Sequence, residues 1–486
     1  MDDRLLTDDD RRLRPGRGQR SPWLREALAA EDDPSPAPPL SGITDADVAI
    51  IGGGYTGLWT AYQLLTREPS LRVVLLEADI CGGGPSGRNG GFINSWWDEA
   101  SGLVEQFGTE GARACLDEVA ASVNAIGEWC ETHGVDAHYR REGMLVVSTT
   151  PLHDGRWDAD VHTATHLGEP DALRELTAGE VADRCRSPRF RGGAMMRDGA
   201  TIQPALLARG LRRVLISLGV EIHEGTRVKA VSEGPDGRLR VVTADGEVRA
   251  RQVVLAVNAW AAGWREARNR VLTWGSYMVR SEPAPDLIAS ELGWTGGESI
   301  VDARFSVHYL HVTRDGRIAI GAGGGRPGYG GRIGATFTDD VSAARRAAFA
   351  FRWLFPQLSD VRLTDAWGGP IDVSPDHLPH VWSSRGGRLH VAAGYSGNGV
   401  APSHLAGRIL AAVTLGSGEP LTRLPIVGRS RLVFPPEPFR YIGARVMRAA
   451  MIRREDTEEA GRQPHRLLRE LSRLPRRLGY HLGPGS

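Results

Sequence analysis

Residues 48–57 read Val-Ala-Ile-Ile-Gly-Gly-Gly-Tyr-Thr-Gly, and residues 71–77 read Leu-Arg-Val-Val-Leu-Leu-Glu. The first stretch is an apolar run that ends in a Gly-x-Gly-x-x-Gly turn, and the helical pattern of residues 58–65 separates it from the second apolar run. A strand, a glycine-rich turn, a helix and a second strand in this order are typical of a unit that binds the pyrophosphate of a dinucleotide. The glycine pattern alone is weak evidence, so the prediction depends on this context.

The glycines and the terminal acid have separate expected roles. Gly52 permits the tight turn, Gly54 lets the backbone approach a pyrophosphate, and Gly57 lets the helix pack on the strand. The helix N-terminus offers unpaired N–H groups to the phosphates, and Glu77 can accept a hydrogen bond from a ribose hydroxyl. The first set of predicted cofactor-binding residues is therefore Gly52, Gly53, Gly54, Tyr55, Thr56, Gly57, Glu77 and Ala78.

A second glycine-rich loop at residues 81–92 favours FAD over NAD. Arg88 can neutralise phosphate charge, and Asn89 can present both a donor and an acceptor. With this loop the chain resembles the D-amino-acid oxidase-like superfamily of FAD-dependent oxidoreductases. The Ser-Gly-Arg-Asn-Gly-Gly run of residues 86–91 is similar to the gamma-glutamylputrescine oxidase-like branch. The resemblance implies that the loop contacts FAD through Ser86, Arg88, Asn89, Gly90 and Gly91.

The resemblance covers residues 46–415 and implies an α/β fold, in which a Rossmann-like FAD-binding domain is joined to a mainly antiparallel-sheet substrate domain of α+β type. The expected N-terminal tail and linker is 1–45, and the C-terminal extension is 416–486. The FAD-binding domain is expected in three parts, 46–99, 200–264 and 385–415. The substrate domain is expected in two parts, 100–199 with its helices and 265–384.

Further cofactor contacts are implied in the second and third parts of the FAD-binding domain. The backbone of Val228 is expected at the adenine, and Asn258 stands where many relatives have a glycine near the phosphates. Asn tolerates the left-handed conformation better than most residues, so that turn is expected to survive. A strand at 389–393 leads into a third glycine loop and a helix that starts near Pro402; the loop is expected to meet the flavin through Gly394, Tyr395, Ser396, Gly397, Asn398, Gly399 and Val400.

The FAD is expected to be bound non-covalently. Some sarcosine-oxidising relatives link flavin to a cysteine in the segment that aligns with residues 366–379, but no cysteine follows Cys185 here. Other relatives use a histidine in the first glycine loop, which this chain lacks. Sarcosine-oxidising relatives often have an oxygen-activating lysine just after the third glycine loop, where this chain has Ala401. Either a protonated histidine or an arginine is expected to take its place, with His308 and His377 as the candidate catalytic residues, or reoxidation by oxygen is slow and another acceptor is used.

Candidates for substrate binding lie in the second part of the substrate domain. Arg304 or Arg326 could grip a carboxylate with two parallel hydrogen bonds, although either could equally be a solvated surface arginine. Strand alternation places Tyr309 on the face opposite His308, and either face could meet a ligand.

Composition excludes several classes of protein. The 59 basic and 59 acidic residues give no net charge, which argues against a nucleic-acid partner. The four cysteines show no metal-binding spacing, so no metal is expected, and reduced thiols favour a cytoplasmic location. No apolar run is long enough to span a membrane.

The remaining expectations concern local structure. Residues 1–20 are expected to be disordered and the folded core to start near Asp47, while a short helix at 21–28 either docks as a clip or stays in a solvated tail. Strands are expected at 227–232 and 238–244. The basic helix at 442–453 is expected to dock on the body, with contact to a membrane surface as a less favoured alternative.

These observations predict an FAD-dependent enzyme that oxidises the C–N bond of a small amine or amino acid, by hydride transfer to flavin N5, with oxygen or another electron acceptor. One alternative is a dehydrogenase that passes electrons to a quinone or carrier protein. The other is a flavin-binding protein without turnover. The glycine loops indicate FAD binding only, so they do not decide among the three.

Overall fold

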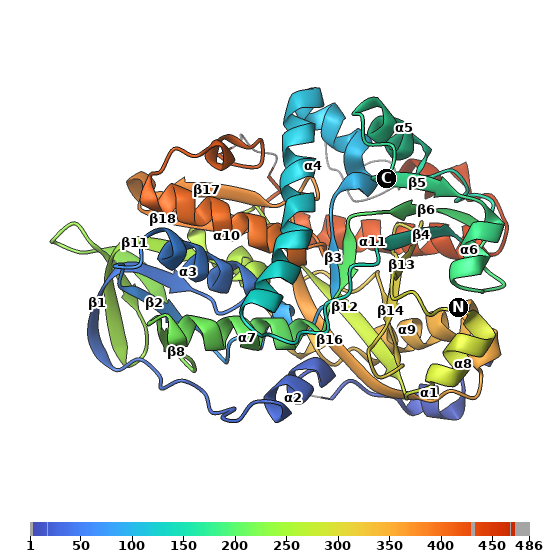
Figure 1. Ribbon diagram of the computed structural model, residues 1–486, viewed down its shortest axis with the longest axis horizontal. Coiled ribbons are helices and arrows are strands. Elements are labelled where there is room, and N and C mark those ends of the chain that lie inside the picture. The colour runs from blue at the N-terminus through green and yellow to red at the C-terminus, as the bar shows by residue number, and fades with distance from the viewer. Residues whose placement is uncertain (1–2, 17, 429–432, 467, 472–486) are drawn as a thin grey trace.

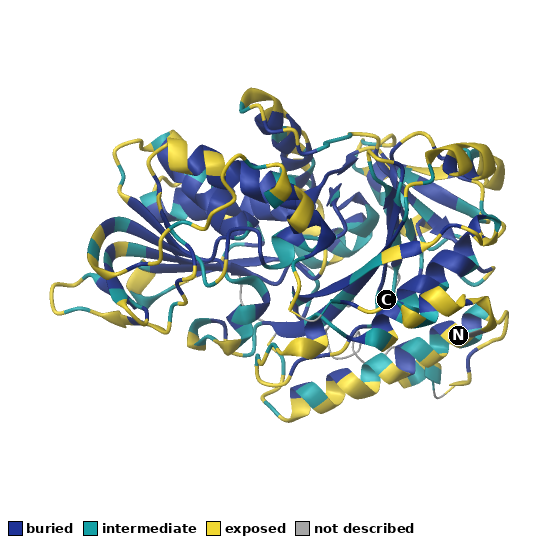
Figure 2. Cartoon of the chain, turned by 90° about the horizontal axis from the view of Figure 1, so that it is seen from below, coloured by how far each residue is buried: buried dark blue, intermediate teal, exposed yellow. Residues whose placement is uncertain are grey.

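The computed structural model describes residues 3–16, 18–428, 433–466 and 468–471. It contains two eight-stranded sheets, which occupy opposite halves of the molecule in Figure 1, and a two-stranded sheet of β3 (Phe92–Asn94) and β7 (Gly199–Thr201). In Figure 2 the central parts of both sheets are buried, and exposed residues gather on the outer turns, the helix faces and the outer strand ends. This arrangement confirms the expected α/β fold class.

The first sheet is the expected nucleotide-binding sheet. Its central strands β1, β2 and β11 run parallel, as in a Rossmann-like unit, and the strand order is β17-β18-β11-β1-β2-β8, with β10 and β9 added beside β11. The second half of β1 is buried on both faces, which explains the continuous apolar run at 48–51. Val48 and Ile50 pack in the cluster that includes α3, whereas Ala49 and Ile51 pack in the cluster that includes residues of β9 and β10. The strands are β1 (Gly42–Ile51), β2 (Val73–Leu76), β8 (Glu221–His223), β9 (Ala230–Glu233), β10 (Leu239–Val242), β11 (Gly246–Leu255), β17 (His380–Ser384) and β18 (Leu389–Ala393).

The second sheet is mainly antiparallel, in the order β16-β12-β15-β14-β13-β4-β6-β5. Its one parallel pair among the described strands is β13 with β4, where the two parts of the expected substrate domain meet. The hairpin of β14 and β15 is confirmed, with His308 opposite Ala322. The strands are β4 (Met144–Ser148), β5 (Leu173–Leu176), β6 (Gly192–Met196), β12 (Leu272–Ser281), β13 (Ser299–Asp302), β14 (His308–Val312), β15 (Ile318–Ala322) and β16 (Leu363–Val373).

Helices cover the first sheet and join the two halves. Helices α3 and α10 lie side by side on the first sheet, and α4 rises beside them in Figure 1 with a kink at Gly108, whose φ is 70°. Helix α9 packs against the second sheet. The helices are α1 (Asp8–Arg12), α2 (Pro22–Ala29), α3 (Tyr55–Arg67), α4 (Ala100–Thr132), α5 (Asp158–His166), α6 (Ala178–Arg184), α7 (Pro204–Ser217), α8 (Pro285–Leu287), α9 (Val341–Leu354), α10 (Val400–Leu415) and α11 (Phe439–Glu459).

The N-terminal region corrects the expectation of disorder over residues 1–20. Helix α1 is capped by Thr7, and Asp10 is only 1% exposed because its carboxylate receives two hydrogen bonds from Arg352, at 2.9 and 3.1 Å. Leu6 packs in the core of the second sheet. Leu6 and the Asp10–Arg352 pair therefore join this charged segment to the second sheet and α9, which composition alone does not reveal.

Several boundaries in the nucleotide-binding half also differ from expectation. The first sheet begins at Gly42 instead of near Asp47, because the first half of β1 pairs with β11. Strand β9 starts at Ala230 instead of Arg227, and β10 covers only Leu239–Val242. The chain returns to the first sheet at His380, before the expected boundary at 385, because β17 pairs with β18.

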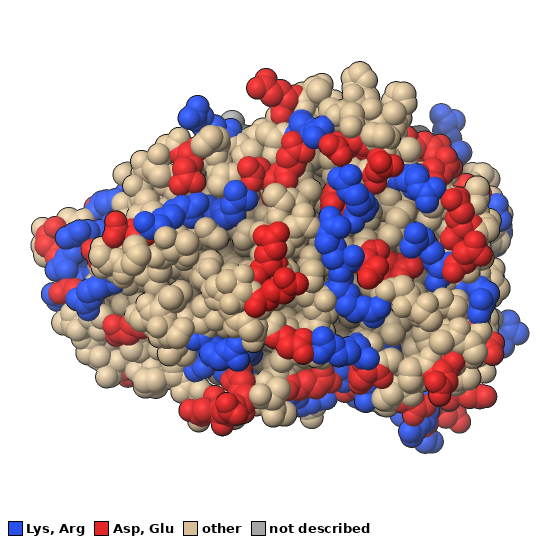
Figure 3. Space-filling view, viewed as in Figure 1, with Lys and Arg blue, Asp and Glu red and all other residues tan. Residues whose placement is uncertain are grey.

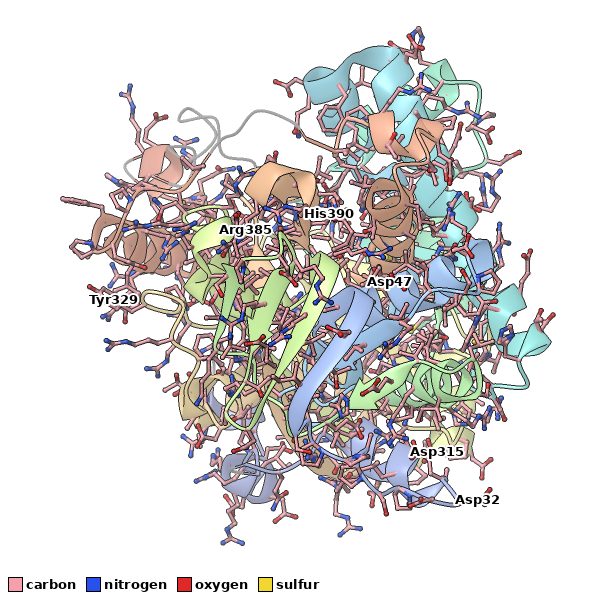
Figure 4. The ribbon with its side chains drawn as sticks, turned by 90° about the vertical axis from the view of Figure 1, so that its left-hand side faces the viewer. Asp32, Asp47, Asp315, Tyr329, Arg385 and His390 are labelled. Carbon is pink, nitrogen blue, oxygen red and sulfur yellow. The ribbon has the colours of Figure 1, made fainter. Side chains whose placement is uncertain are left out.

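Helix α11 docks on the body of the protein, as predicted. Its buried residues are Arg440, Ala444, Ala450, Met451, Glu455 and Glu458. The Tyr441 ring lies 5.5 Å from that of Tyr329, which Figure 4 places at the outer edge of the molecule. Two apolar residues of this helix, Ile442 and Val446, are exposed.

Charges of both signs are interspersed over the face drawn in Figure 3, as the balanced composition predicts. Among the described helices none is long and apolar enough to cross a membrane. The cytoplasmic location stays a prediction.

Candidate functional site

A cavity of about 1620 Å³ is lined by both large sheets. It exceeds the roughly 300–1,000 Å³ of ordinary small-molecule pockets, so it has room for a dinucleotide together with a substrate. All three predicted glycine loops contribute to its lining, as do β12, β13 and β14 of the second sheet. The site predicted from separate stretches of sequence is therefore one continuous space.

The first glycine turn is as tight as its pattern predicts. Gly52 has a φ of 112°, and a Cβ there would lie 2.3 Å from the carbonyl oxygen of Ala256. A Cβ on Gly57 would lie 2.0 Å from the carbonyl oxygen of Gly52. Both glycines are required by the protein itself, because the turn and helix α3 pack without space for a side chain.

Gly54 differs from these two glycines. A Cβ there would meet only the Ser86 hydroxyl, at 3.0 Å, and the residue lines the cavity at the N-terminus of α3. The backbone N–H of Tyr55 donates to the same hydroxyl at 2.9 Å. The open side of Gly54 thus faces ligand space, where a backbone can approach a phosphate.

Glu77 lies beside this turn and lines the cavity with Ala78 and Val228. Its carboxylate accepts hydrogen bonds from the backbone N–H of Gly53 at 2.7 Å and of Asp79 at 2.8 Å. Burial raises the pKa of Glu77, and these two hydrogen bonds oppose that shift. The two bonds fix the carboxylate at the end of β2, where the pattern predicted a ribose-binding acid.

The second glycine loop is organised by its own side chains. Asn89 accepts a hydrogen bond from the Gly91 N–H at 2.8 Å and donates to the carbonyl oxygens of Pro85 and Ser86. Arg88 donates to the carbonyl oxygens of Gly83, Gly368 and Gln19. The loop residues Ser86, Arg88, Asn89 and Gly90 line the cavity, whereas Gly91 is buried behind it.

The N-terminal clip holds this loop, and the sequence left its docking open. Trp23 of α2 is buried, and its indole N–H donates to the Asn89 carbonyl oxygen at 3.1 Å. Its ring meets that of Trp367 edge-on, 5.5 Å away. Ser21 hydrogen-bonds to the Gly87 carbonyl oxygen. The short helix therefore supports the cavity wall from outside.

The third glycine loop depends on Asp372, which the sequence analysis did not single out. This fully buried carboxylate accepts hydrogen bonds from the N–H groups of Gly394 at 2.5 Å and Tyr395 at 3.2 Å, and from the Asn258 amide at 2.8 Å. Burial raises the pKa of Asp372 to about 6. Asn258 has a φ of 44°, so it does adopt the left-handed turn. No local signal marks Asp372, because its partners come from residues distant in sequence.

Two residues predicted as ligand contacts also have structural roles. The Thr56 and Tyr395 hydroxyls are 2.7 Å apart and join the first glycine turn to the third loop. The Tyr55 hydroxyl donates to the Pro204 carbonyl oxygen at 2.6 Å, so its ring packs in the core while its backbone faces the cavity. The third loop delivers Tyr395, Ser396, Gly397, Asn398, Gly399 and Val400 to the lining, at the N-terminus of α10.

The structure brings two of the five predicted substrate and catalytic residues to the cavity. Tyr309 lines it, with its hydroxyl 2.6 Å from that of Ser276. His377 also lines it and has a φ of 65°, with Nδ1 3.5 Å from a Glu99 carboxylate oxygen. A non-glycine residue held in this backbone region is a mark of a functional or constrained position.

The other three lie elsewhere. Arg304 and His308 line a separate small cavity, where Arg304 forms buried ion pairs with Glu455 at 3.3 Å and with Glu459. His308 Nδ1 lies 2.7 Å from an Asp302 carboxylate oxygen. Arg326 is exposed and pairs with Asp340 at 2.7 Å, outside the main lining. These partners occupy the groups that were expected to bind substrate.

The described residues fit a bound dinucleotide. One cavity is enclosed by the Rossmann-like sheet and the antiparallel sheet. It is faced by the first glycine turn, which leaves open space at Gly54, and by the N-termini of α3 and α10. Helix N-termini and bare backbone at glycine are what a pyrophosphate requires. Fold and site thus define a two-domain protein of the dinucleotide-binding class.

Comparisons with known proteins identify the family. The model of the FAD dependent oxidoreductase (DAO) family matches residues 47–413, and the chain belongs to this family of enzymes. It is 30% identical over 398 residues to the probable oxidoreductase OrdL of Rhizobium meliloti, covering 80% of this chain and 87% of that protein. It is 28% identical over 396 residues to the gamma-glutamylputrescine oxidoreductase of Escherichia coli, covering 79% and 87% of the two chains.

Solved structures share the fold. Glycine oxidase from Geobacillus kaustophilus superposes with a TM-score of 0.64 at 22% identity, covering 80% of this chain and all of that one. L-proline dehydrogenase from P. horikoshii also gives 0.64, at 19% identity, covering 78% and 96%. The resemblance read from the glycine loops is therefore confirmed at the level of family and fold.

Proposed function

We propose that this flavoprotein oxidises the C–N bond of a small amine or amino acid. The supporting observation is the continuous cavity, which runs from the three glycine loops to the face of the second sheet at Tyr309 and Met278. Curated relatives with amine or amino-acid names, such as the gamma-glutamylputrescine oxidoreductase, favour this reaction. The proposed division into FAD-binding and substrate domains follows the two sheets.

FAD, when bound, accepts a hydride at N5 and supplies the redox chemistry. The chain's own part is to orient the substrate carbon, to leave the reacting amine neutral and to limit access of water. The substrate loses a hydride from carbon and a proton from nitrogen, and water hydrolyses the resulting imine. Apolar side chains of Met278, Val301 and Phe305 line this part of the cavity and reduce its hydration.

The third glycine loop is the proposed support for the negative charge of reduced flavin. Helix α10 begins with unpaired N–H groups and the positive end of its dipole, and Asp372 fixes the loop that leads into it. Ala401 is buried in the first turn of α10, in place of the lysine that the resemblance expected. We propose His377 as the catalytic histidine, because it is the predicted one that reaches the cavity.

Anaerobic mixing with a panel of amines and amino acids tests this function. The absorbance of oxidised flavin near 450 nm should bleach with one or more of them, at a rate that saturates with concentration. Bleaching by no compound in the panel would favour the flavin-binding protein without turnover. Rapid bleaching followed by slow reoxidation in air would favour the dehydrogenase that uses a quinone or carrier protein.

The FAD is expected to be released by acid. The cysteines in the described residues are Cys81, Cys115, Cys130 and Cys185, all buried outside the lining, and the lining histidine His377 is not in the first glycine loop. Purified protein should therefore be yellow, and precipitation in trichloroacetic acid should leave the flavin in the supernatant. Flavin that stays with the pellet would show a covalent link.

A further inference from the structure

The second glycine loop is held by a segment that lies outside the family match. This segment, the N-terminal clip, comprises residues 19–28, whereas the match begins at residue 47. Its helix α2 packs against α7, as Figure 1 shows. The loop residues Ser86, Arg88 and Asn89 line the main cavity. The same loop therefore contacts the clip and forms part of the predicted cofactor site.

Three consecutive carbonyl oxygens of the loop receive hydrogen bonds from groups outside it. The carbonyl oxygens of residues 87, 88 and 89 accept, in that order, from the Ser21 hydroxyl, from the Trp367 indole N–H at 2.9 Å and from the Trp23 indole N–H at 3.1 Å. Because each peptide group is planar, a fixed carbonyl also fixes the N–H of the next residue. Two of the three donors belong to the clip, so the clip sets the backbone orientation of this part of the loop.

The clip also contacts charged groups at the cavity. The Arg20 guanidinium donates to Asp79 at 2.8 Å, and Asp79 lines the cavity just before the loop. The Arg88 guanidinium, predicted to neutralise phosphate charge, donates to the Gln19 carbonyl oxygen at 3.1 Å. Contacts with the clip thus help to orient a cofactor-binding side chain as well as the loop backbone.

The clip itself is anchored to both halves of the molecule. Trp23 is only 1% exposed, and its carbonyl oxygen accepts from the amide of Gln203, the N-cap of α7, at 2.8 Å. The Arg280 guanidinium of β12 lies 4.9 Å from the centre of the Trp23 ring. Met278 and Ala319 of the second sheet pack in the same apolar cluster as Trp23. A residue anchored from two sides can transmit that order to the loop.

The loop has particular need of such support. Residues 81–92 include six glycines, and glycine loses more conformational freedom on ordering than any other residue. If FAD had to order this loop on binding, the entropy cost would be subtracted from its affinity. Contacts that order the loop beforehand remove that cost, so they raise affinity without touching the ligand.

We propose that Ser21 and Trp23 are positioning residues for FAD. Through the carbonyl oxygens of residues 87 and 89 they hold the second glycine loop in its binding conformation, although neither lines the cavity. The affinity for FAD therefore depends on a segment that precedes the family match. The inference concerns cofactor binding, and it does not depend on which amine the enzyme oxidises.

FAD titration of the deflavinated, full-length protein tests the inference without any amine present. Quenching of flavin fluorescence gives the Kd, and visible circular dichroism reports the surroundings of the bound flavin. Trp23→Ala removes the ring and the donor, so we expect the Kd to rise at least tenfold and the visible spectrum to change. Trp23→Phe keeps a ring and Ser21→Gly keeps a residue accepted at an N-cap, so each removes one donor to the loop and should raise the Kd by about two- to tenfold.

Leu6→Ala is the matched control, because Leu6 is also a buried N-terminal residue but packs in the core of the second sheet, outside the main lining. Thermal melting should show that Leu6→Ala is destabilised while its FAD Kd stays at the wild-type value. If Trp23→Ala does not fold, Trp23→Phe and Ser21→Gly decide the test. Wild-type FAD affinity in every folded clip variant, or an equal rise of the Kd in Leu6→Ala, would overturn the inference. Neither result bears on the proposed amine oxidation, which the anaerobic amine panel tests separately.

Discussion

Gly54→Val is expected to yield a folded protein that purifies with little or no FAD. The protein leaves room for the new side chain, since a Cβ at Gly54 would meet only the Ser86 hydroxyl at 3.0 Å. The branched side chain would instead extend into the cavity where the backbone is expected to approach a pyrophosphate. We expect FAD affinity to fall by at least a hundredfold, about 2.7 kcal/mol.

The measurement is FAD titration of the deflavinated protein, followed by quenching of flavin fluorescence, alongside circular dichroism. Gly334→Val is the matched control, because a Cβ at Gly334 has no neighbour within 4 Å and the residue is exposed outside the main lining. Gly57→Val should differ from both by failing to fold, since its Cβ would lie 2.0 Å from the Gly52 carbonyl oxygen. Wild-type FAD affinity in folded Gly54→Val would show that the first glycine turn does not hold the cofactor.

Glu455→Ala is expected to lower the free energy of unfolding by about 3–5 kcal/mol, because it leaves the buried Arg304 guanidinium short of negative charge. Glu455 is 3% exposed, lies 3.3 Å from Arg304 and also accepts a hydrogen bond from the Ser306 N–H at 2.5 Å. Chemical denaturation measures the loss. Glu282→Ala removes a partner from the pair with Arg362, whose side chain is largely exposed, and should cost no more than about 1 kcal/mol.

The double variant Arg304→Met, Glu455→Leu tests whether the loss of stability in Glu455→Ala comes from the buried, unpaired charge of Arg304. It should be more stable than Glu455→Ala, because the buried charges of Arg304 and Glu455 are both removed. Glu459 loses its partner Arg304, but its side chain is 14% exposed and therefore keeps some contact with solvent. The same variants test the alternative role of Arg304 as a carboxylate grip. If Arg304→Met weakened the binding of amino acids without lowering stability, the substrate-binding role predicted from sequence would be supported over the structural one.

The C-terminal extension lies beyond the family match, which ends at residue 413, but its helix α11 contributes to the lining of the main cavity. Its residues Ala444, Val446, Met447 and Met451 line the main cavity, while Glu455 and Glu458 anchor it to the second sheet and to His153. Arg448 adds hydrogen bonds to the carbonyl oxygens of Gly324 and Gly325 at 2.8 and 2.6 Å. The extension is therefore a wall of the cavity, which its basic, amphipathic sequence did not indicate.

The sequence by itself determined the nucleotide-binding half. Backbone geometry requires glycine at positions 52 and 57, and Asn258 suits its position because asparagine tolerates a positive φ. The run at 48–51 is apolar because this part of the parallel strand is buried on both faces. These constraints act between residues close in the chain or within one repeating pattern. They can therefore be read before the fold is known.

Only the tertiary structure decided which of the predicted side chains line the main cavity. From sequence, Arg304 and Arg326 were equal candidates for binding a carboxylate, but in the structure Arg304 pairs with Glu455, 151 residues away, and Arg326 pairs with Asp340. Turn and strand geometry depend on the local chain, so they could be predicted from the sequence. Ion pairing and burial of a side chain depend on residues that only the folded structure brings together, so they could not.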